Sequence, residues 1–122
     1  RRILEDMKAG VREEEDQRVK VIFFGAGFIC EHYIKRLRIR ENPDFLVICL
    51  SDNDPEKWGT ERSGLRVIPP AELCGREFDL LVVTTEQYYM PVKKQLVYEL
   101  FLAEEKILRM DVFSEMYIGR YQ

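Results

Sequence analysis

Between residues 19 and 30 the chain reads Val-Lys-Val-Ile-Phe-Phe-Gly-Ala-Gly-Phe-Ile-Cys, an apolar run that leads into a Gly-x-Gly turn. The run predicts a buried strand, and the turn after it predicts the start of a helix. Such a turn directs the first amides of the helix, and the positive end of its dipole, toward one point that favours an anion such as a pyrophosphate. We expect Gly25 to permit the turn and Gly27 to let a ligand approach the backbone.

Cys30 occupies the third small-residue position of the dinucleotide-binding fingerprint G-x-G-x-x-G/A, counted from Gly25 and Gly27. That position allows the helix to pack closely on the strand, and cysteine is small enough to do so. Two alternatives stay open. The turn could bind nothing, or the Cys30 thiol could be acidified by the helix N-terminus and exposed to the ligand. The motif therefore locates a site more firmly than it names a ligand.

The composition describes one globular domain. With 122 residues, 46% of them hydrophobic, the chain can build one core but not a nucleotide domain plus a substrate domain. A net charge of -3 and a single histidine argue against a nucleic-acid partner. No apolar run approaches the roughly 20 residues of a membrane span and no secretory signal precedes the first strand, so we expect a cytoplasmic protein with no membrane span.

The remaining composition signals concern the N-terminal segment and the cysteines. Residues 1–18 combine apolar residues at helical spacing with an acidic run, which predicts an amphipathic helix or a charged connector before a single domain at 19–122. Cys30, Cys49 and Cys74 are odd in number and widely spaced, and they predict reduced buried thiols rather than disulfides or a metal site.

Beyond residue 30 the pattern alternates between helical and strand-like segments. We expect a helix over 28–40, strands over 45–50, 64–68, 78–84 and 106–110, single helical turns over 55–59 and 71–74, a long helix over 91–103 and a closing helical turn within 111–122. Trp58 is expected to close the edge of the core, and His32 to lie on the surface.

This succession predicts an α/β fold, a Rossmann-like open parallel sheet of about five strands in the order 3-2-1-4-5 with helices on both faces. In such a sheet the ligand lies beyond the carboxyl ends of the strands where the order reverses, between the first and fourth strands. Nine candidate binding residues gather there: Gly25, Ala26, Gly27, Phe28, Ser51, Asp52, Thr84, Thr85 and Tyr88.

Asp52 has two interpretations. It lies 25 residues after Gly27, near the place where a carboxylate beyond the second strand of a Rossmann unit accepts hydrogen bonds from ribose hydroxyls. In that role its charge would repel a 2′-phosphate and favour NAD over NADP. Asp52 could equally serve as a turn or helix-capping residue, because Asp, Asn and Pro cluster around it.

Four stretches resemble the small Rossmann domains attached to bacterial nucleotide-sugar dehydratases, sugar acyltransferases, glycosyltransferases and methyltransferases. They are FGAG at 24–27, LSDNDPEKWG at 50–59, GLRVIPPAEL at 64–73 and FDLLVVT at 78–84, and the resemblance spans roughly residues 19 to 112. Domains of that group bind NAD(P), a nucleotide-sugar or CoA, or have lost binding. The resemblance implies that Gly25 and Gly27 contact phosphates and that Asp52 contacts a ribose, while Cys30 departs from the Gly, Ala or Ser of the group.

Two functions follow as hypotheses. The first is a module that binds NAD, NADP or a nucleotide-sugar within a larger sugar- or polysaccharide-modifying enzyme, with other domains of the parent chain as partners and a homodimer left open. The second is a regulatory or interaction domain that keeps the fold without a nucleotide. No catalytic residue is assigned, because nothing pairs a nucleophile with a base. A phospho-acceptor receiver domain is disfavoured because Gly-Ala-Gly stands where acidic residues would be needed.

Overall fold

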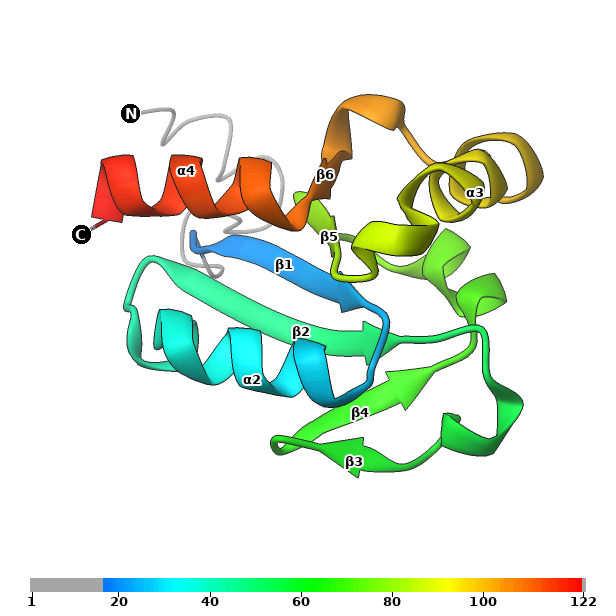
Figure 1. Cartoon of the computed structure of the whole chain (residues 1–122), viewed down its shortest axis with the longest axis horizontal. Helices are drawn as coiled ribbons and strands as arrows, with labels where there is room; N and C mark the ends of the chain where they lie inside the picture. Colours follow the sequence, from blue (N-terminus) through cyan, green and yellow to red (C-terminus); the bar gives the residue numbers. More distant parts are fainter. Residues whose placement is uncertain (1–16, 122) are drawn as a thin grey trace, which may run out of the picture.

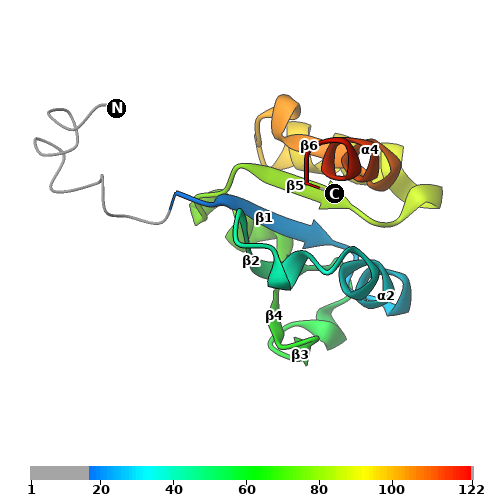
Figure 2. The same cartoon turned by 90° about the vertical axis from the view of Figure 1, so that its left-hand side faces the viewer.

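The computed structural model describes residues 17–121, and the helix or connector predicted for residues 1–18 lies outside that range apart from Gln17 and Arg18. The first predicted strand, β1 (Val19–Phe24), lies at the centre of the sheet between β2 and β5 (Figures 1 and 2). The other parallel strands are β2 (Phe45–Ser51), β4 (Leu65–Ile68), β5 (Leu80–Val83) and β6 (Ile107–Arg109). Their order, β4-β2-β1-β5-β6, confirms the predicted 3-2-1-4-5 arrangement.

One strand was not expected. A two-residue strand, β3 (Glu61–Arg62), pairs antiparallel with β4 at the sheet edge. The tight turn between them uses Ser63 and Gly64, whose φ angles are 56° and 76°. Two consecutive residues with positive φ give a hairpin turn whose twist matches that of the strands. The sheet therefore has six strands, with one short antiparallel edge.

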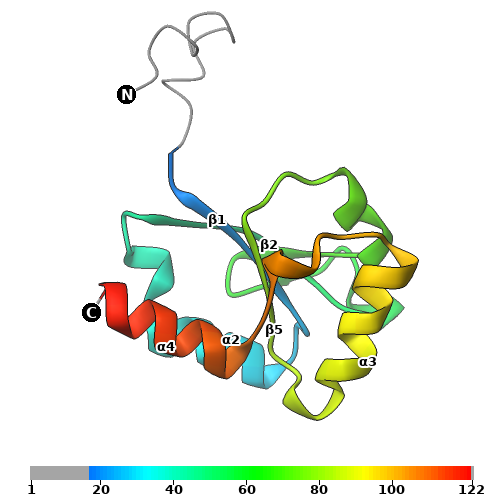
Figure 3. The same cartoon turned by 90° about the horizontal axis from the view of Figure 1, so that it is seen from above.

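Helices cover both faces of the sheet because β1 is apolar on both sides. Val21 and Phe23 face a core shared with α2 (Phe28–Leu37) and α4 (Met110–Tyr121). The alternate residues Ile22 and Phe24 face a second core closed by α3 (Tyr89–Lys94) and the π-helical segment η6 (Gln95–Glu99). Figure 3 shows α2 beside α4, with α3 across the sheet from them. Strands buried on both faces are typical of a parallel sheet between helical layers.

The first crossover helix is shorter than predicted. It ends at Leu37, because Arg38 adopts a left-handed conformation with φ of 55° and donates its N–H to the carbonyl of Lys35. A 3-10 turn, η2 (Ile39–Glu41), follows. The break turns the fully buried Ile39 into the core, which a continued α-helix over 28–40 would not do.

The predicted long helix over 91–103 is also wrong at its end. It consists of α3 and then η6, and it stops at Glu99. A π-helical turn is wider than an α-turn and shifts every later side chain around the axis. Val92 and Leu96 are buried, whereas Leu100 is half-buried and Ala103, beyond the end of the helix, is exposed.

The closing segment, in contrast, forms a full helix. α4 runs over twelve residues from Met110 and places Phe113 and Tyr117 in the core. The Phe113 ring lies edge-on to Phe23 and Phe45, with centroids 6.1 and 6.2 Å away. Short 3-10 helices complete the described chain, namely η3 (Pro55–Lys57), η4 (Pro70–Gly75), η5 (Glu86–Tyr88) and η7 (Glu104–Lys106). Within residues 17–121 no helix has the length and apolar character needed to cross a membrane.

Candidate functional site

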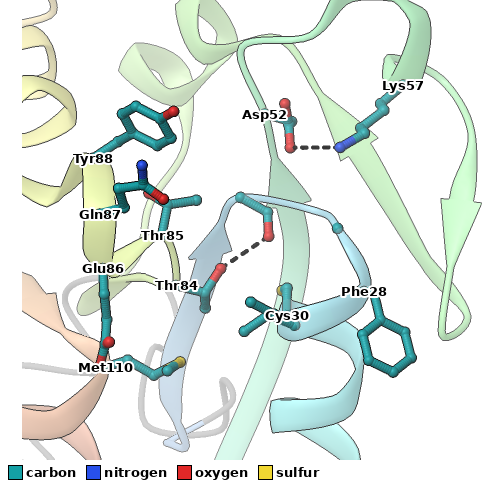
Figure 4. A pocket seen from close by; sticks show the side chains of 13 residues that line it. Phe28, Cys30, Asp52, Lys57, Thr84, Thr85, Glu86, Gln87, Tyr88 and Met110 are labelled. Carbon is teal, nitrogen blue, oxygen red and sulfur yellow. Dashed lines mark hydrogen bonds and ion pairs between the residues drawn. The ribbon is translucent and has the colours of Figure 1, made fainter.

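A cavity of about 570 Å³ opens at the carboxyl ends of β1, β2 and β5. Seven of the nine predicted site residues line it: Gly25, Gly27, Phe28, Asp52, Thr84, Thr85 and Tyr88. Figure 4 shows Thr85, Gln87 and Tyr88 on one side of the cavity, and Phe28 and Lys57 on the other. The topological switch point thus holds a cavity in the place that the strand order predicts.

Gly25 is required by the fold. Its φ of +101° lies in a region that L side chains rarely adopt, and a Cβ added there would lie 2.7 Å from Cγ2 of Thr85 and 2.8 Å from Oγ1 of Thr84. The Thr84 hydroxyl donates to the carbonyl oxygens of Phe24 and Gly25, each 2.9 Å away. The Gly25 N–H donates to the carbonyl of Ser51 at 2.8 Å. The turn after β1 is therefore held from both neighbouring strands.

Gly27 is not required by the fold in the same way. Its φ is −99°, which any residue can adopt, and a Cβ added there would meet only Nζ of Lys57, at 3.8 Å. Helix α2 begins directly after Gly27, and no side chain caps it. The first amides of an α-helix have no partner inside the helix, so this end can bind an acceptor. Gly27 and Lys57 therefore line the same cavity, and a side chain at position 27 would come into contact with the Lys57 ammonium.

Asp52 closes the glycine turn. Its Oδ2 accepts the N–H of Ala26 at 2.7 Å, and its Oδ1 accepts the N–H of Asp54 at 2.8 Å. This is the turn role that the sequence left open. Oδ1 keeps a further lone pair for a ligand, while the second lone pair of Oδ2 faces Nζ of Lys57 at 3.5 Å. Trp58 supports the same loop, because its Nε1–H donates to the Asp52 carbonyl at 2.7 Å. Trp58 is 38% exposed, so the expectation that it closes the core is wrong.

Two predicted residues lie behind the cavity wall. Ala26 is fully buried, and its backbone N–H donates a hydrogen bond to Asp52, which lines the cavity. Ser51 is also fully buried, and its hydroxyl donates to the Ile68 carbonyl at 2.9 Å. Both residues shape the site without lining it.

Five lining residues were missed by the sequence reasoning, namely Ile29, Lys57, Glu86, Gln87 and Met110, and Cys30, which the sequence left as an alternative, also lines the cavity. Lys57 is the chemically important one. Its Nζ lies 3.5 Å from Oδ2 of Asp52, and the two side chains point toward each other (Figure 4). The Lys-x-Gly triplet at 57–59 was the available signal, but it does not show which way the lysine points.

The cysteines are free, as predicted, but not all are buried. Cys30 and Cys49 are buried, whereas Cys74 is exposed. Cys30 packs in the same core cluster as Val21 and Phe23. Burial raises the pKa of the Cys30 thiol to about 12 and that of Cys49 to about 11. The direction is opposite to that of an acidified thiol, so the close-packing interpretation of Cys30 accounts for the structure.

His32 is exposed, as predicted, and its ring stacks on Phe28 with centroids 5.9 Å apart. Within the part of the chain that the structure describes, no group of three or more His, Cys, Asp or Glu side chains is placed to hold a metal ion.

The fold and the cavity define a Rossmann-like domain with a glycine turn at the carboxyl edge of its sheet. Residues 17–108 match the model of the family described as C2185-like, N-terminal, and the chain belongs to that family. No curated protein matches the sequence.

Solved structures share the fold at low identity. UDP-D-quinovosamine 4-dehydrogenase from Vibrio fischeri is 18% identical with a TM-score of 0.58, over 81% of this chain and 86% of that one. RSP, a Rex-family repressor, is 13% identical with a TM-score of 0.53, over 94% of this chain and 66% of the repressor. RSP in complex with β-NAD⁺ and operator DNA is 11% identical with a TM-score of 0.54, over 94% of this chain and 64% of the repressor. This chain thus spans about two thirds of the repressor's length.

Proposed function

We propose that this domain binds a nucleotide, most simply NAD, through the Gly-Ala-Gly turn and the start of α2. The observation that carries the proposal is the contrast between the two glycines. The fold needs Gly25, with its φ of +101°, but it does not need Gly27, whose missing side chain leaves space bounded by Nζ of Lys57. A diphosphate in that space would meet unpaired helix amides and the positive end of the α2 dipole.

The rest of the cavity fits the same ligand class. Its volume of about 570 Å³ is within the range of small-molecule sites. Asp52 would accept ribose hydroxyls on its remaining lone pairs, and its charge would favour NAD over NADP. Thr84, Thr85 and Tyr88 would contact the ligand from the other wall. The Thr85 hydroxyl is buried and has no hydrogen-bond partner among the described residues, which suits a polar ligand group.

The solved relatives support an NAD-type ligand, because RSP has been crystallised with β-NADH and with β-NAD⁺ and operator DNA. The likeness to a UDP-sugar dehydrogenase keeps a nucleotide-sugar as the next choice, with CoA after it. We propose that the domain serves a larger cytoplasmic bacterial enzyme that modifies sugars or polysaccharides. We propose no catalysis by the domain alone, because the sequence pairs no nucleophile with a base.

A second candidate function is protein interaction without a nucleotide. Its specific support is a set of exposed apolar side chains near α3, where Tyr98 is 72% exposed, Phe101 is 83% exposed and Met90 is 56% exposed. Large exposed apolar side chains in one region are typical of contact surfaces.

Thermal unfolding with NAD⁺, NADP⁺, CoA and UDP-glucose separates the two functions. A ligand at 100 times its dissociation constant stabilises the folded state by about 2.7 kcal/mol. We expect NAD⁺ to raise the melting temperature of the wild type. In Gly27→Val we expect no rise with NAD⁺ and an unchanged ligand-free melting temperature. Gly75→Val is the matched control, since a Cβ at Gly75 meets nothing within 4 Å and Gly75 lies outside the cavity. No shift with any of the four compounds would favour the interaction function.

A further inference from the structure

The backbone around Lys57 is held by hydrogen bonds within its own loop. Lys57 ends the 3-10 turn η3, which the Asp54 side chain caps by accepting the N–H of Glu56 at 3.0 Å. The Lys57 carbonyl accepts the hydroxyl of Thr60 at 2.6 Å and the N–H of Thr60 at 3.1 Å. With its backbone fixed on both sides, the side chain extends back over the glycine turn, where Nζ would lie 3.8 Å from a Cβ at position 27.

The contact between Lys57 and Asp52 is the weakest one that this carboxylate makes. Nζ lies 3.5 Å from Oδ2, whereas the Ala26 N–H donates to the same oxygen at 2.7 Å. An ammonium has three donors, and among the described residues Asp52 is its one hydrogen-bond partner. Lys57 can therefore leave Asp52 while Asp52 remains bound to the turn.

Because acidic side chains line the cavity, an anionic ligand would need a cationic side chain beside it. Among the described lining residues Lys57 is the only cation, against the carboxylates of Asp52 and Glu86. In addition, Asp52 accepts the Ala26 N–H. This amide is therefore not available to donate to a phosphate, and the turn has one donor fewer for an anion. Lys57 is placed to supply the missing donor and the missing charge.

We propose that Lys57 is the phosphate-binding residue of this site, exchanging its long contact with Asp52 for the phosphoanhydride of the bound nucleotide. The inference rests on the proposed nucleotide function and narrows its ligand class. The ligand carries a diphosphate that lies between the ammonium and the start of α2. Nucleosides without phosphate groups are excluded from tight binding, because they leave Lys57 with Asp52.

Isothermal titration of NAD⁺, UDP-glucose and inorganic pyrophosphate into four proteins tests this role. The proteins are the wild type, Lys57→Gln, Lys57→Arg and Lys94→Gln. Lys94 is exposed and lies outside the cavity, so its variant makes the same change in net charge elsewhere. For the probe that binds the wild type best, Lys57→Gln should weaken binding about 10- to 100-fold, the usual effect of losing a charged hydrogen bond. Lys57→Arg should keep most of the affinity, and Lys94→Gln should match the wild type.

Two further measurements on Lys57→Gln distinguish a phosphate contact from a structural role of Lys57. The ligand-free melting temperature of Lys57→Gln should stay near that of the wild type, and its binding should depend less on salt concentration. Wild-type affinity in Lys57→Gln, or an equal loss in Lys94→Gln, would overturn the role of Lys57 and leave the nucleotide function standing. No binding of any probe to the wild type would overturn the nucleotide function itself and the role of Lys57 with it.

Discussion

Oδ2 of Asp52 lies 2.7 Å from the amide nitrogen of Ala26, so the carboxylate that follows β2 fastens the glycine turn that follows β1. The two strands are neighbours in the parallel sheet, and their carboxyl ends meet at the cavity. The residue expected to meet a ribose thus also holds the turn expected to meet the phosphates. The shape of the turn and the charge of the cavity depend on the same side chain.

Asp52→Ala should lower the free energy of unfolding by about 1 to 3 kcal/mol, because it leaves two backbone N–H groups without their acceptor. Asp54→Ala is the control in the same loop, since it removes only the cap of η3 and should cost about 1 kcal/mol or less. Urea unfolding measures both, and equal losses would contradict the bracing role. Nucleotide titration of Asp52→Ala gives the ribose contribution separately, because a variant that loses stability and keeps its affinity assigns Asp52 to the turn alone.

Substitution by alanine should destabilise the protein at Gly25 but not at Gly27. Gly25→Ala places a Cβ within 2.8 Å of Thr84 and Thr85 at a φ of +101°, so we expect a loss of at least about 2 kcal/mol. Gly27→Ala meets only the Lys57 ammonium at 3.8 Å and should change stability by less than about 0.5 kcal/mol. Denaturant unfolding of the two variants checks the contrast, and a Gly25→Ala protein as stable as the wild type would contradict it.

The buried Cys30 thiol should make stability depend on alkaline pH. Its folded pKa of about 12 exceeds the ordinary value of 9.0, so below pH 9 the thiol stays protonated in both states and its contribution is fully present. As the pH rises from 9 toward 12 the unfolded chain ionises first, and that contribution is lost.

In Cys30→Ala the loss of unfolding free energy between about pH 8.5 and about pH 10.5 should be smaller by about 1 to 2 kcal/mol. Cys49, with its pKa raised to about 11, contributes equally in both proteins and cancels in the comparison. Urea unfolding at the two pH values provides the measurement. An identical pH dependence in the two proteins would show that the thiol is not held neutral by burial.

The C-terminal helix should be energetically part of the domain, although it lies beyond the residues matched by the family model. Phe113→Ala should cost about 3 to 5 kcal/mol, because the ring is fully buried against Phe23 and Phe45. Phe101→Ala removes a ring that is 83% exposed and should change stability by less than about 0.5 kcal/mol. Similar melting temperatures for the two variants would place α4 outside the cooperative unit.

The central architecture could be predicted because its causes are local. An apolar run on both faces predicts β1 as a central strand, and Gly25 marks the turn that ends it. The handedness of crossovers then leaves few ways to order the parallel strands. Since ligands lie where the strand order reverses, the sequence alone predicts that Asp52 and Thr84 lie at one cavity.

The errors arise where tertiary packing overrides local preference. Arg38 takes a left-handed conformation although its sequence favours a continued helix, and this turns Ile39 into the core. The π-helical turn of η6 has no sequence signature of the kind that glycine or proline gives a turn. Lys57 reaches the cavity through the path of the loop after β2, which residue spacing does not determine.

Nucleotide binding at the glycine turn is tested most directly by titrating NAD⁺ into the isotope-labelled protein and following its backbone amide resonances. We predict saturable shifts concentrated in residues 25–31, 52–57 and 84–88, the three segments that surround the cavity, with residues of α4 beyond Met110 unchanged. Saturable shifts confined to α3 and η6, or no shift with NAD⁺, NADP⁺, CoA or UDP-glucose, would contradict a nucleotide site at the carboxyl edge of the sheet.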